Sequence, residues 1–280
     1  MFYYTLRRID DQIYSITDEA YVHAFLITGD KQALLVDTCC GLGDIREAVR
    51  EVTNLPVTVW CTHGHLDHMG GASVFDKVYL NPADRRLALK HSGKYMRIQY
   101  VKRILRDRYH FTEEEFVPGK RTGYLPLADQ QTLDLGGITA EAIYFPGHTP
   151  GMTAVLLREK RVMILGDACN RLTYLILEES GSVEEYRDVL LSFREKYYDQ
   201  FDYALVSHDD EIVEKEIIPN TIEVCDEVLS GTDDHTPRIF FIYEGILAKN
   251  IVEHRPVRVD GKVGNIAYHK DKVFKKGNNV

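Results

Sequence analysis

The sequence predicts an α+β fold in which helices pack against β-sheets. Short runs of β-branched and aliphatic residues predict strands at about 1–18, 22–28, 33–37, 57–61, 138–145, 152–158, 162–166 and 203–207. Between Val183 and Tyr197, apolar residues recur every three or four positions, which predicts an amphipathic helix resting on a sheet. A chain of 280 residues can bury a large core, so we expect one domain over residues 1–280.

Further elements are expected between and after these strands. Gly29 and Asp30 separate two strands and predict a hairpin turn. Residues 42–52 have helical character, and another helix is expected from about 213 to 229. Residues from about 235 to 280 predict a strand-rich extension of the same domain rather than an independent one.

A basic helical insertion is expected at about 82–122. Between Arg85 and His110, nine Lys and Arg residues stand against a single Asp, although the whole chain has a net charge of −9. Such a segment forms either a solvated helical face or a surface that holds an anionic substrate, with Lys102 and Arg103 as candidate contacts. The negative total argues against general binding to nucleic acid.

Composition indicates an ordinary globular protein. Hydrophobic residues make up 44% and charged residues 28% of the chain, and no apolar run approaches the ~18 residues of a membrane span. Residues 1–18 mix charges with aromatic residues, unlike a secretion signal. The five cysteines are scattered, without a CxxC pair. We therefore expect a soluble cytoplasmic protein without a membrane partner.

The stretch "CTHGHLDHMGG" follows a predicted buried strand and is rich in metal-binding side chains. It places His63, His65, Asp67 and His68 within six residues, between glycines that permit a tight turn. Neutral imidazole together with carboxylate suits zinc and similar transition metals, whereas a cluster of carboxylates alone would suit magnesium or calcium. One such histidine would indicate only a polar loop; this density favours a metal site.

Three other strand ends carry the same kinds of donor. His148 lies in "FPGHTPG", Asp167 in "ILGDACN" and His208 in "LVSHDD", each directly after an apolar run. The four donors of the first segment would be enough for one tetrahedral ion. Seven donors are too many for one closed structural zinc and suit two metal ions that share a bridging carboxylate.

The pattern HxHxDH, formed by His63, His65, Asp67 and His68 and followed in order by His148, Asp167 and His208, resembles the metallo-β-lactamase-fold superfamily. The "GHTPG" segment is especially similar to the hydroxyacylglutathione hydrolase and lactonase-like branch. The resemblance extends from Asp37 to His208. It implies a four-layer αββα sandwich with two mixed β-sheets flanked by helices.

The resemblance also implies a role for each donor. His63, His65 and His148 would bind one metal, Asp67, His68 and His208 would bind the other, and Asp167 would bridge the two. Asp37 matches a position that contacts a ligand instead of the metal and fixes its orientation. Zinc is the expected metal, although iron or manganese suits the same donors.

Such a site implies hydrolysis by a hydroxide that bridges the two metal ions. Asp67 would orient the attacking water and later pass a proton to the leaving group. No side-chain nucleophile is needed, so Ser207 and Cys169 are not expected to act as one. Asn170 is a candidate donor to a developing oxyanion, or else caps a turn, and Tyr174 is a candidate substrate contact.

The leading prediction is a metal-dependent hydrolase of a small ester-like substrate, with a thioester or a lactone favoured. The alternative is a phosphodiesterase or nuclease whose basic insertion holds an anionic substrate.

A diiron redox enzyme is disfavoured because such enzymes typically carry Glu where this chain has His65. A β-lactamase is disfavoured because that branch has Cys or His in place of Asp167. The complete donor set disfavours a non-catalytic binding module, and a dimer is compatible with the sequence.

Overall fold

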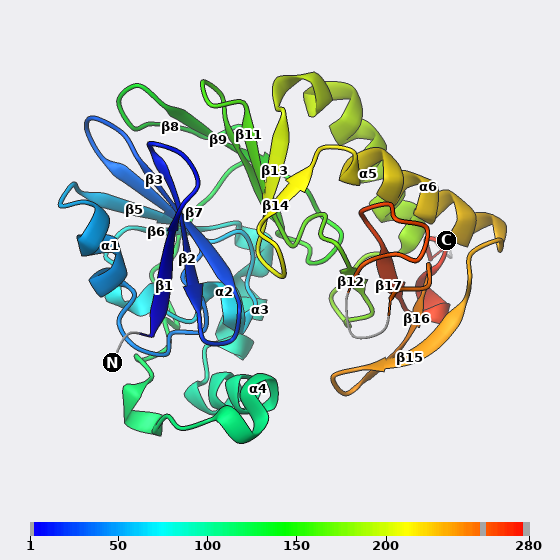
Figure 1. The fold of residues 1–280 in the computed structure, drawn as a ribbon, viewed down its shortest axis with the longest axis horizontal. Coiled ribbons are helices and arrows are strands. Elements are labelled where there is room, and N and C mark those ends of the chain that lie inside the picture. Colours follow the sequence, from blue (N-terminus) through cyan, green and yellow to red (C-terminus); the bar gives the residue numbers. More distant parts are fainter. Residues whose placement is uncertain (1–2, 253–255, 277–280) are drawn as a thin grey trace. The chain divides into compact units, whose positions relative to one another are not determined.

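The computed structural model describes residues 3–252 and 256–276, and the chain divides into two compact units, residues 1–144 and 145–280 (Figure 1). Each unit combines β-strands with helices, and each contains both parallel and antiparallel strand pairs. These observations confirm the predicted α+β class. Among the described residues, no helix is both long and apolar enough to cross a membrane.

Unit 1 is built on a mixed sheet of seven strands that follow one another in sequence order. They are β1 (Tyr4–Arg8), β2 (Ile13–Asp18), β3 (His23–Thr28), β4 (Ala33–Val36), β5 (Val57–Trp60), β6 (Val78–Leu80) and β7 (Leu125–Pro126). The first four are antiparallel, and β4 to β7 are parallel. Because β4 and β5 are parallel neighbours, their carboxyl ends lie at the same edge of the sheet.

The remaining elements of unit 1 are mostly short. They are the helices α1 (Arg46–Val52), α2 (Leu66–Met69), α3 (Arg85–His91) and α4 (Lys94–Leu105), the 3₁₀ turns η1 (Ala72–Val74), η2 (Pro82–Asp84), η3 (Arg106–Arg108) and η4 (Glu113–Glu115), and the antiparallel hairpin of β8 (Thr132–Asp134) with β9 (Thr139–Tyr144). The predicted turn at Gly29 and Asp30 joins the antiparallel strands β3 and β4, which confirms the hairpin.

Unit 2 contains two groups of strands and two long helices. The first group is β10 (Thr153–Leu157), β11 (Val162–Gly166), β13 (Tyr203–Val206) and β14 (Ile212–Glu214). The second is a four-stranded sheet in the order β12 (Thr173–Leu175), β17 (Ile266–Tyr268), β16 (Tyr243–Leu247) and β15 (Thr236–Phe240). The helices are α5 (Val183–Tyr197) and α6 (Ile217–Ser230), with 3₁₀ turns η5 (Tyr198–Gln200) and η6 (Lys270–Lys272).

Helix α5 confirms its predicted pattern. Val183, Tyr186, Leu190 and Phe193 are all buried along one side of the helix. Ser182 caps the first turn, because its hydroxyl accepts from the Glu185 amide while the Glu185 carboxylate accepts from the Ser182 amide. Local sequence and core packing therefore specify the same helix.

Two predicted helix starts were too early. The helix expected from residue 42 begins at Arg46, because Gly43 has a φ of 72° and turns the chain before it. The helix expected from about residue 213 begins at Ile217, because residues 212–214 pair with β13 as strand β14. Only the middle residue of β14, Val213, is buried, which is strand alternation rather than a helical repeat.

Candidate metal centre

In unit 1, the carboxyl ends of the parallel strands β4 and β5 place Asp37 beside the histidine segment. The Asp37 carboxylate is buried and accepts hydrogen bonds from the Thr62 amide at 2.7 Å and the Thr62 hydroxyl at 2.7 Å. Its Oδ2 also lies 2.8 Å from Nδ1 of His68. Because a carboxylate only accepts, His68 donates from Nδ1 and keeps the lone pair on Nε2. That tautomer suits a metal ligand.

His63 and His65 converge on one point within the same unit. Thr62 donates its hydroxyl proton to Asp37, so it accepts from His63 Nδ1, 3.0 Å away, and the His63 lone pair is left on Nε2. His63 Nε2 lies 3.0 Å from Nδ1 of His65. Two nitrogen ligands on a tetrahedral zinc ion lie about 3.3 Å apart. Both histidines are buried, and their spacing fits ligands of one ion.

Asp67 and His68 lie in α2, the short helix that follows His65. Their side chains are adjacent, since His68 Nε2 lies 3.8 Å from Asp67 Oδ2. Backbone packing holds this helix: Gly70 lies so close to the loop after β4 that a Cβ atom would come within 2.3 Å of the Cys40 carbonyl oxygen. The sequence brings these donors together locally, and the glycine lets the loops approach.

Helix α4 of the basic insertion contributes a residue that the sequence did not single out. The phenol of Tyr100 hydrogen-bonds to Asp67, and burial together with the negative charge of Asp67 raises the pKa of Tyr100 well above its usual range. The phenol therefore stays protonated and donates to the carboxylate. No local motif marks Tyr100, because it lies more than 30 residues from Asp67 in the chain.

Arg97 of the same helix is fully buried instead of solvated. Its guanidinium donates to the carbonyl oxygens of Cys40 at 3.2 Å, Gly70 at 3.0 Å and Val117 at 2.8 Å. These three oxygens belong to the loop after β4, the end of α2 and the segment after η4. Arg97 thus ties α4, the helix that carries Tyr100, to the end of α2 and to two neighbouring segments.

In unit 2, one carboxylate oxygen lies beside two histidines. Asp167 Oδ2 is 3.6 Å from Nε2 of His148 and 3.4 Å from Nε2 of His208. Nδ1 of His148 donates to the Tyr174 carbonyl oxygen at 2.8 Å, which leaves its Nε2 as the acceptor. Asp167 and His208 follow the neighbouring parallel strands β11 and β13, whose carboxyl ends share one edge. A carboxylate oxygen this close to two imidazole nitrogens could share a metal ion with either of them.

Asn170 and Tyr174 both lie close to Asp167. Nδ2 of Asn170 donates to Asp167 Oδ1 at 3.1 Å, while its backbone amide donates to the Thr173 hydroxyl at 2.8 Å. The side-chain amide of Asn170 therefore orients Asp167, and its backbone amide closes the turn into β12. Burial, with the charges of Asp209 and Asp167, raises the pKa of Tyr174 to about 12, so its phenol is a hydrogen-bond donor at neutral pH.

The other residues discussed from the sequence have simpler environments. Lys102 is exposed and lies over the Tyr109 ring at 5.1 Å from its centroid, and Arg103 is exposed on α4. The Cys169 thiol is buried, which raises its pKa to about 11 and makes a reactive thiolate unfavourable. Within the described residues, the buried hydroxyl of Ser207 has no hydrogen-bond partner, so no base activates it.

Residues 17–196 match the family model of the metallo-beta-lactamase superfamily, which covers more than half of the chain. The chain belongs to this superfamily. Solved structures agree on the fold: a metallo-beta-lactamase from Pontibacter korlensis aligns with a TM-score of 0.59 at 17% identity, over 79% of this chain and 97% of that one. The sec-alkylsulfatase Pisa1 from Pseudomonas sp. aligns with a TM-score of 0.62 at 15% identity, over 81% and 42%. The α+β sandwich of the metallo-β-lactamase fold is thereby confirmed.

Curated relatives include proteins named as a thioesterase and a hydrolase. The human acyl-coenzyme A thioesterase MBLAC2 is 23% identical over 59% of this chain and 66% of its own length. The hydroxyacylglutathione hydrolase GloC of Haemophilus influenzae is 27% identical over 49% of this chain and 61% of its own. The matched region thus spans less than two thirds of the length of each of these relatives. The family implies divalent metal ions, and the His and Asp groups described above could bind them.

Proposed function

We propose that this protein hydrolyses thioesters at a centre of two divalent metal ions. In this proposal, His63, His65 and His148 would hold one ion, Asp67, His68 and His208 would hold the other, and Asp167 would bridge them. The observation that carries it is the position of Asp167 Oδ2, at 3.4 and 3.6 Å from two imidazole nitrogens. The hydrogen bonds that leave Nε2 of His63, His68 and His148 as acceptors support it.

A thioester is favoured over a lactone or a phosphodiester by the relatives. Acyl-coenzyme A thioesterase MBLAC2 and the atrochrysone carboxyl ACP thioesterase of Aspergillus fumigatus are both named for thioester cleavage. Zinc is the proposed metal because imidazole dominates the donor set.

The chain's own residues would divide the reaction between them. Bound divalent ions would lower the pKa of water and polarise the acyl carbonyl. Asp67 would accept the proton of the attacking water and return it to the thiolate as the C–S bond breaks, giving a carboxylic acid and a thiol. Tyr174 would donate its phenolic hydrogen to the oxyanion that develops on the carbonyl oxygen.

The proposal is tested by metal analysis combined with a substrate panel. Metal-depleted protein is reconstituted with zinc, iron or manganese, and acetyl-N-acetylcysteamine, a γ-lactone and bis-nitrophenyl phosphate are compared. We expect two ions per chain and thiol release that exceeds turnover of the other two substrates. Fewer than one ion per chain, or faster phosphodiester cleavage, would reject the proposal.

Replacing Tyr100 with Phe should lower kcat for thioester cleavage about 10- to 100-fold with little change in KM. The substitution removes one hydroxyl, so Asp67 loses the donor that orients it while the ring still packs against its neighbours. The zinc affinity, measured by competition with a chelator, should fall as well. Tyr95→Phe is the matched control, because Tyr95 is on the same helix and 71% exposed. Equal kinetics and zinc affinity in the two variants would show that Tyr100 does not position Asp67.

A further inference from the structure

The hairpin formed by β15 and β16 ends in a group of large apolar side chains. We call residues 239–243 the hairpin tip. Ile239 is 74% exposed and Ile242 is 72% exposed, and Phe241 and Tyr243 are also exposed. The two strands pair in register up to Phe240 and Tyr243, so only Phe241 and Ile242 form the turn. Four neighbouring apolar side chains are unusual at the solvent-facing end of a hairpin.

The two-residue turn of the hairpin contains a residue type that rarely adopts the backbone conformation found there. Phe241 has a φ of 56°, a conformation that costs little for Gly, Asn or Asp but strains a large L-residue. Two-residue hairpin turns usually carry Asn-Gly or Asp-Gly for this reason. Backbone strain that persists at an exposed position points to a functional role for the side chains it presents.

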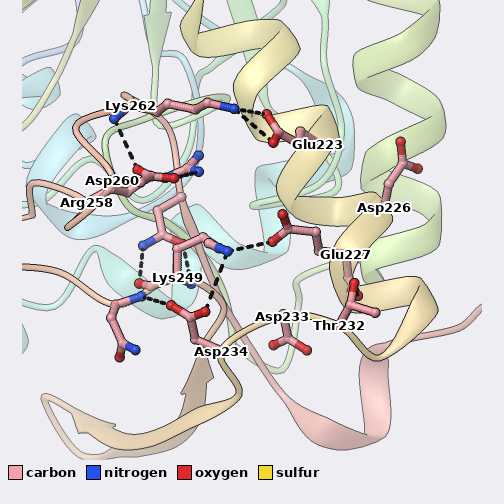
Figure 2. A network of polar contacts seen from close by, with 12 residues as sticks. Glu223, Asp226, Glu227, Thr232, Asp233, Asp234, Lys249, Arg258, Asp260 and Lys262 are labelled. Atoms are coloured by element: carbon pink, nitrogen blue, oxygen red, sulfur yellow. Dashed lines mark hydrogen bonds and ion pairs between the residues drawn. The ribbon is translucent and has the colours of Figure 1, made fainter.

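Ion pairs connect the base of the hairpin to helix α6 of the same unit. Figure 2 shows Lys249 between Glu227 of α6 and Asp234, at 2.9 Å and 3.5 Å, and Lys262 directed at Glu223 of α6. The Asn250 amide also donates to Asp234 at 2.7 Å. The contacts of Lys249 and Asn250 with Asp234 join the segments before and after the hairpin, and the Lys249–Glu227 pair ties them to α6, so the base of the hairpin is supported.

Tyr174 connects the hairpin tip to the candidate metal ligands of unit 2, which are His148, Asp167 and His208. The Tyr174 ring is edge-on to Phe240 and Phe241, with ring centroids 5.6 and 6.4 Å away. The backbone carbonyl oxygen of Tyr174 also accepts the Nδ1 hydrogen bond of His148 at 2.8 Å. Tyr174 and the aromatic side chains of Phe240 and Phe241 therefore connect the donor set to the exposed tip.

We infer that the hairpin tip binds the apolar acyl chain of the substrate. This inference rests on the proposed thioester cleavage, since the carbonyl polarised near Tyr174 would place the acyl chain toward Phe241, Ile239 and Ile242. A short acyl group ends before it reaches the tip, whereas a long one buries apolar surface there. Each buried methylene favours binding about fourfold, so long chains bind more tightly.

The test compares acetyl-, hexanoyl- and decanoyl-N-acetylcysteamine on the reconstituted protein. Wild type should show a KM at least about tenfold lower for the decanoyl than for the acetyl thioester. The double variant Ile239→Ser/Ile242→Ser should lose this difference and keep its acetyl kinetics, because both side chains are exposed and support no core. Val259→Ser is the matched control, since Val259 is 68% exposed in the same unit. Decanoate binding by calorimetry gives a readout that does not depend on turnover.

The outcomes separate the inference from the proposed function. If wild type releases no thiol from any thioester, the proposed function fails, yet decanoate binding that disappears in the double variant still supports an acyl-binding tip. If thioesters are cleaved and the double variant keeps the chain-length preference, the inference is overturned and the proposed function stands. It is also overturned if the double variant changes only binding to phosphatidylcholine vesicles or only the oligomeric state.

Discussion

Asp167→Ala is expected, on the proposed function, to lower kcat for thioester cleavage about 10³-fold and to reduce the bound metal from two ions per chain to one or fewer. The variant loses the carboxylate oxygen that lies 3.4 Å from His208 and 3.6 Å from His148. Without the Asp167 carboxylate the two ions would repel each other, and several kcal/mol of stabilisation at the reacting carbonyl would be lost with the second ion. About 4 kcal/mol corresponds to a factor of 10³ in rate.

Metal analysis and steady-state kinetics on the same sample check this prediction. Asp210→Ala is the matched control, because the Asp210 side chain is 92% exposed in the same unit, and it should keep both metals and activity. An Asp167→Ala protein that retains two ions and more than about a tenth of the wild-type kcat would show that this carboxylate does not bridge.

Arg97→Met is expected to lower the free energy of unfolding by about 3 to 5 kcal/mol. The substitution keeps most of the apolar volume but removes the donors to the carbonyl oxygens of Cys40, Gly70 and Val117, which are left without these hydrogen bonds in a buried place. Burial lowers the pKa of Arg97 and opposes its charge, so these three acceptors are what stabilise the guanidinium there.

Urea unfolding of the metal-free protein measures this change without a contribution from bound ions. Arg103→Met is the control on the same helix, since Arg103 is exposed, and its unfolding free energy should change by about 0.5 kcal/mol or less. Comparable small changes in both variants would contradict a stabilising role for the buried guanidinium.

The basic insertion illustrates what charge counting could and could not predict. From sequence, its cations formed either a solvated face or a surface for an anionic substrate. In the structure these cations differ in burial: Lys102 and Arg103 are exposed, whereas Arg97 is buried among carbonyl oxygens. Burial depends on which loops meet the helix. A one-dimensional pattern of charges does not contain that information.

Strand β14 shows a similar limit for secondary structure. The sequence predicts a helix from about residue 213, yet residues 212–214 pair with β13. In a stretch this short, hydrogen bonding to a neighbouring strand outweighs the weak local preference. Long periodic elements such as α5 were predicted with correct bounds, because their repeat and cap are encoded locally.

The sequence by itself determined the α+β class, the superfamily and the identity of the seven candidate donors, because these depend on residue types at the ends of strands and on a motif contained in one turn. Their assignment to two ions stays a prediction. Only the tertiary structure decided that Tyr100 meets Asp67, that Asn170 holds Asp167 and that the hairpin tip adjoins Tyr174. Those contacts join residues from different elements, and chain folding, rather than spacing along the chain, determines which of them meet.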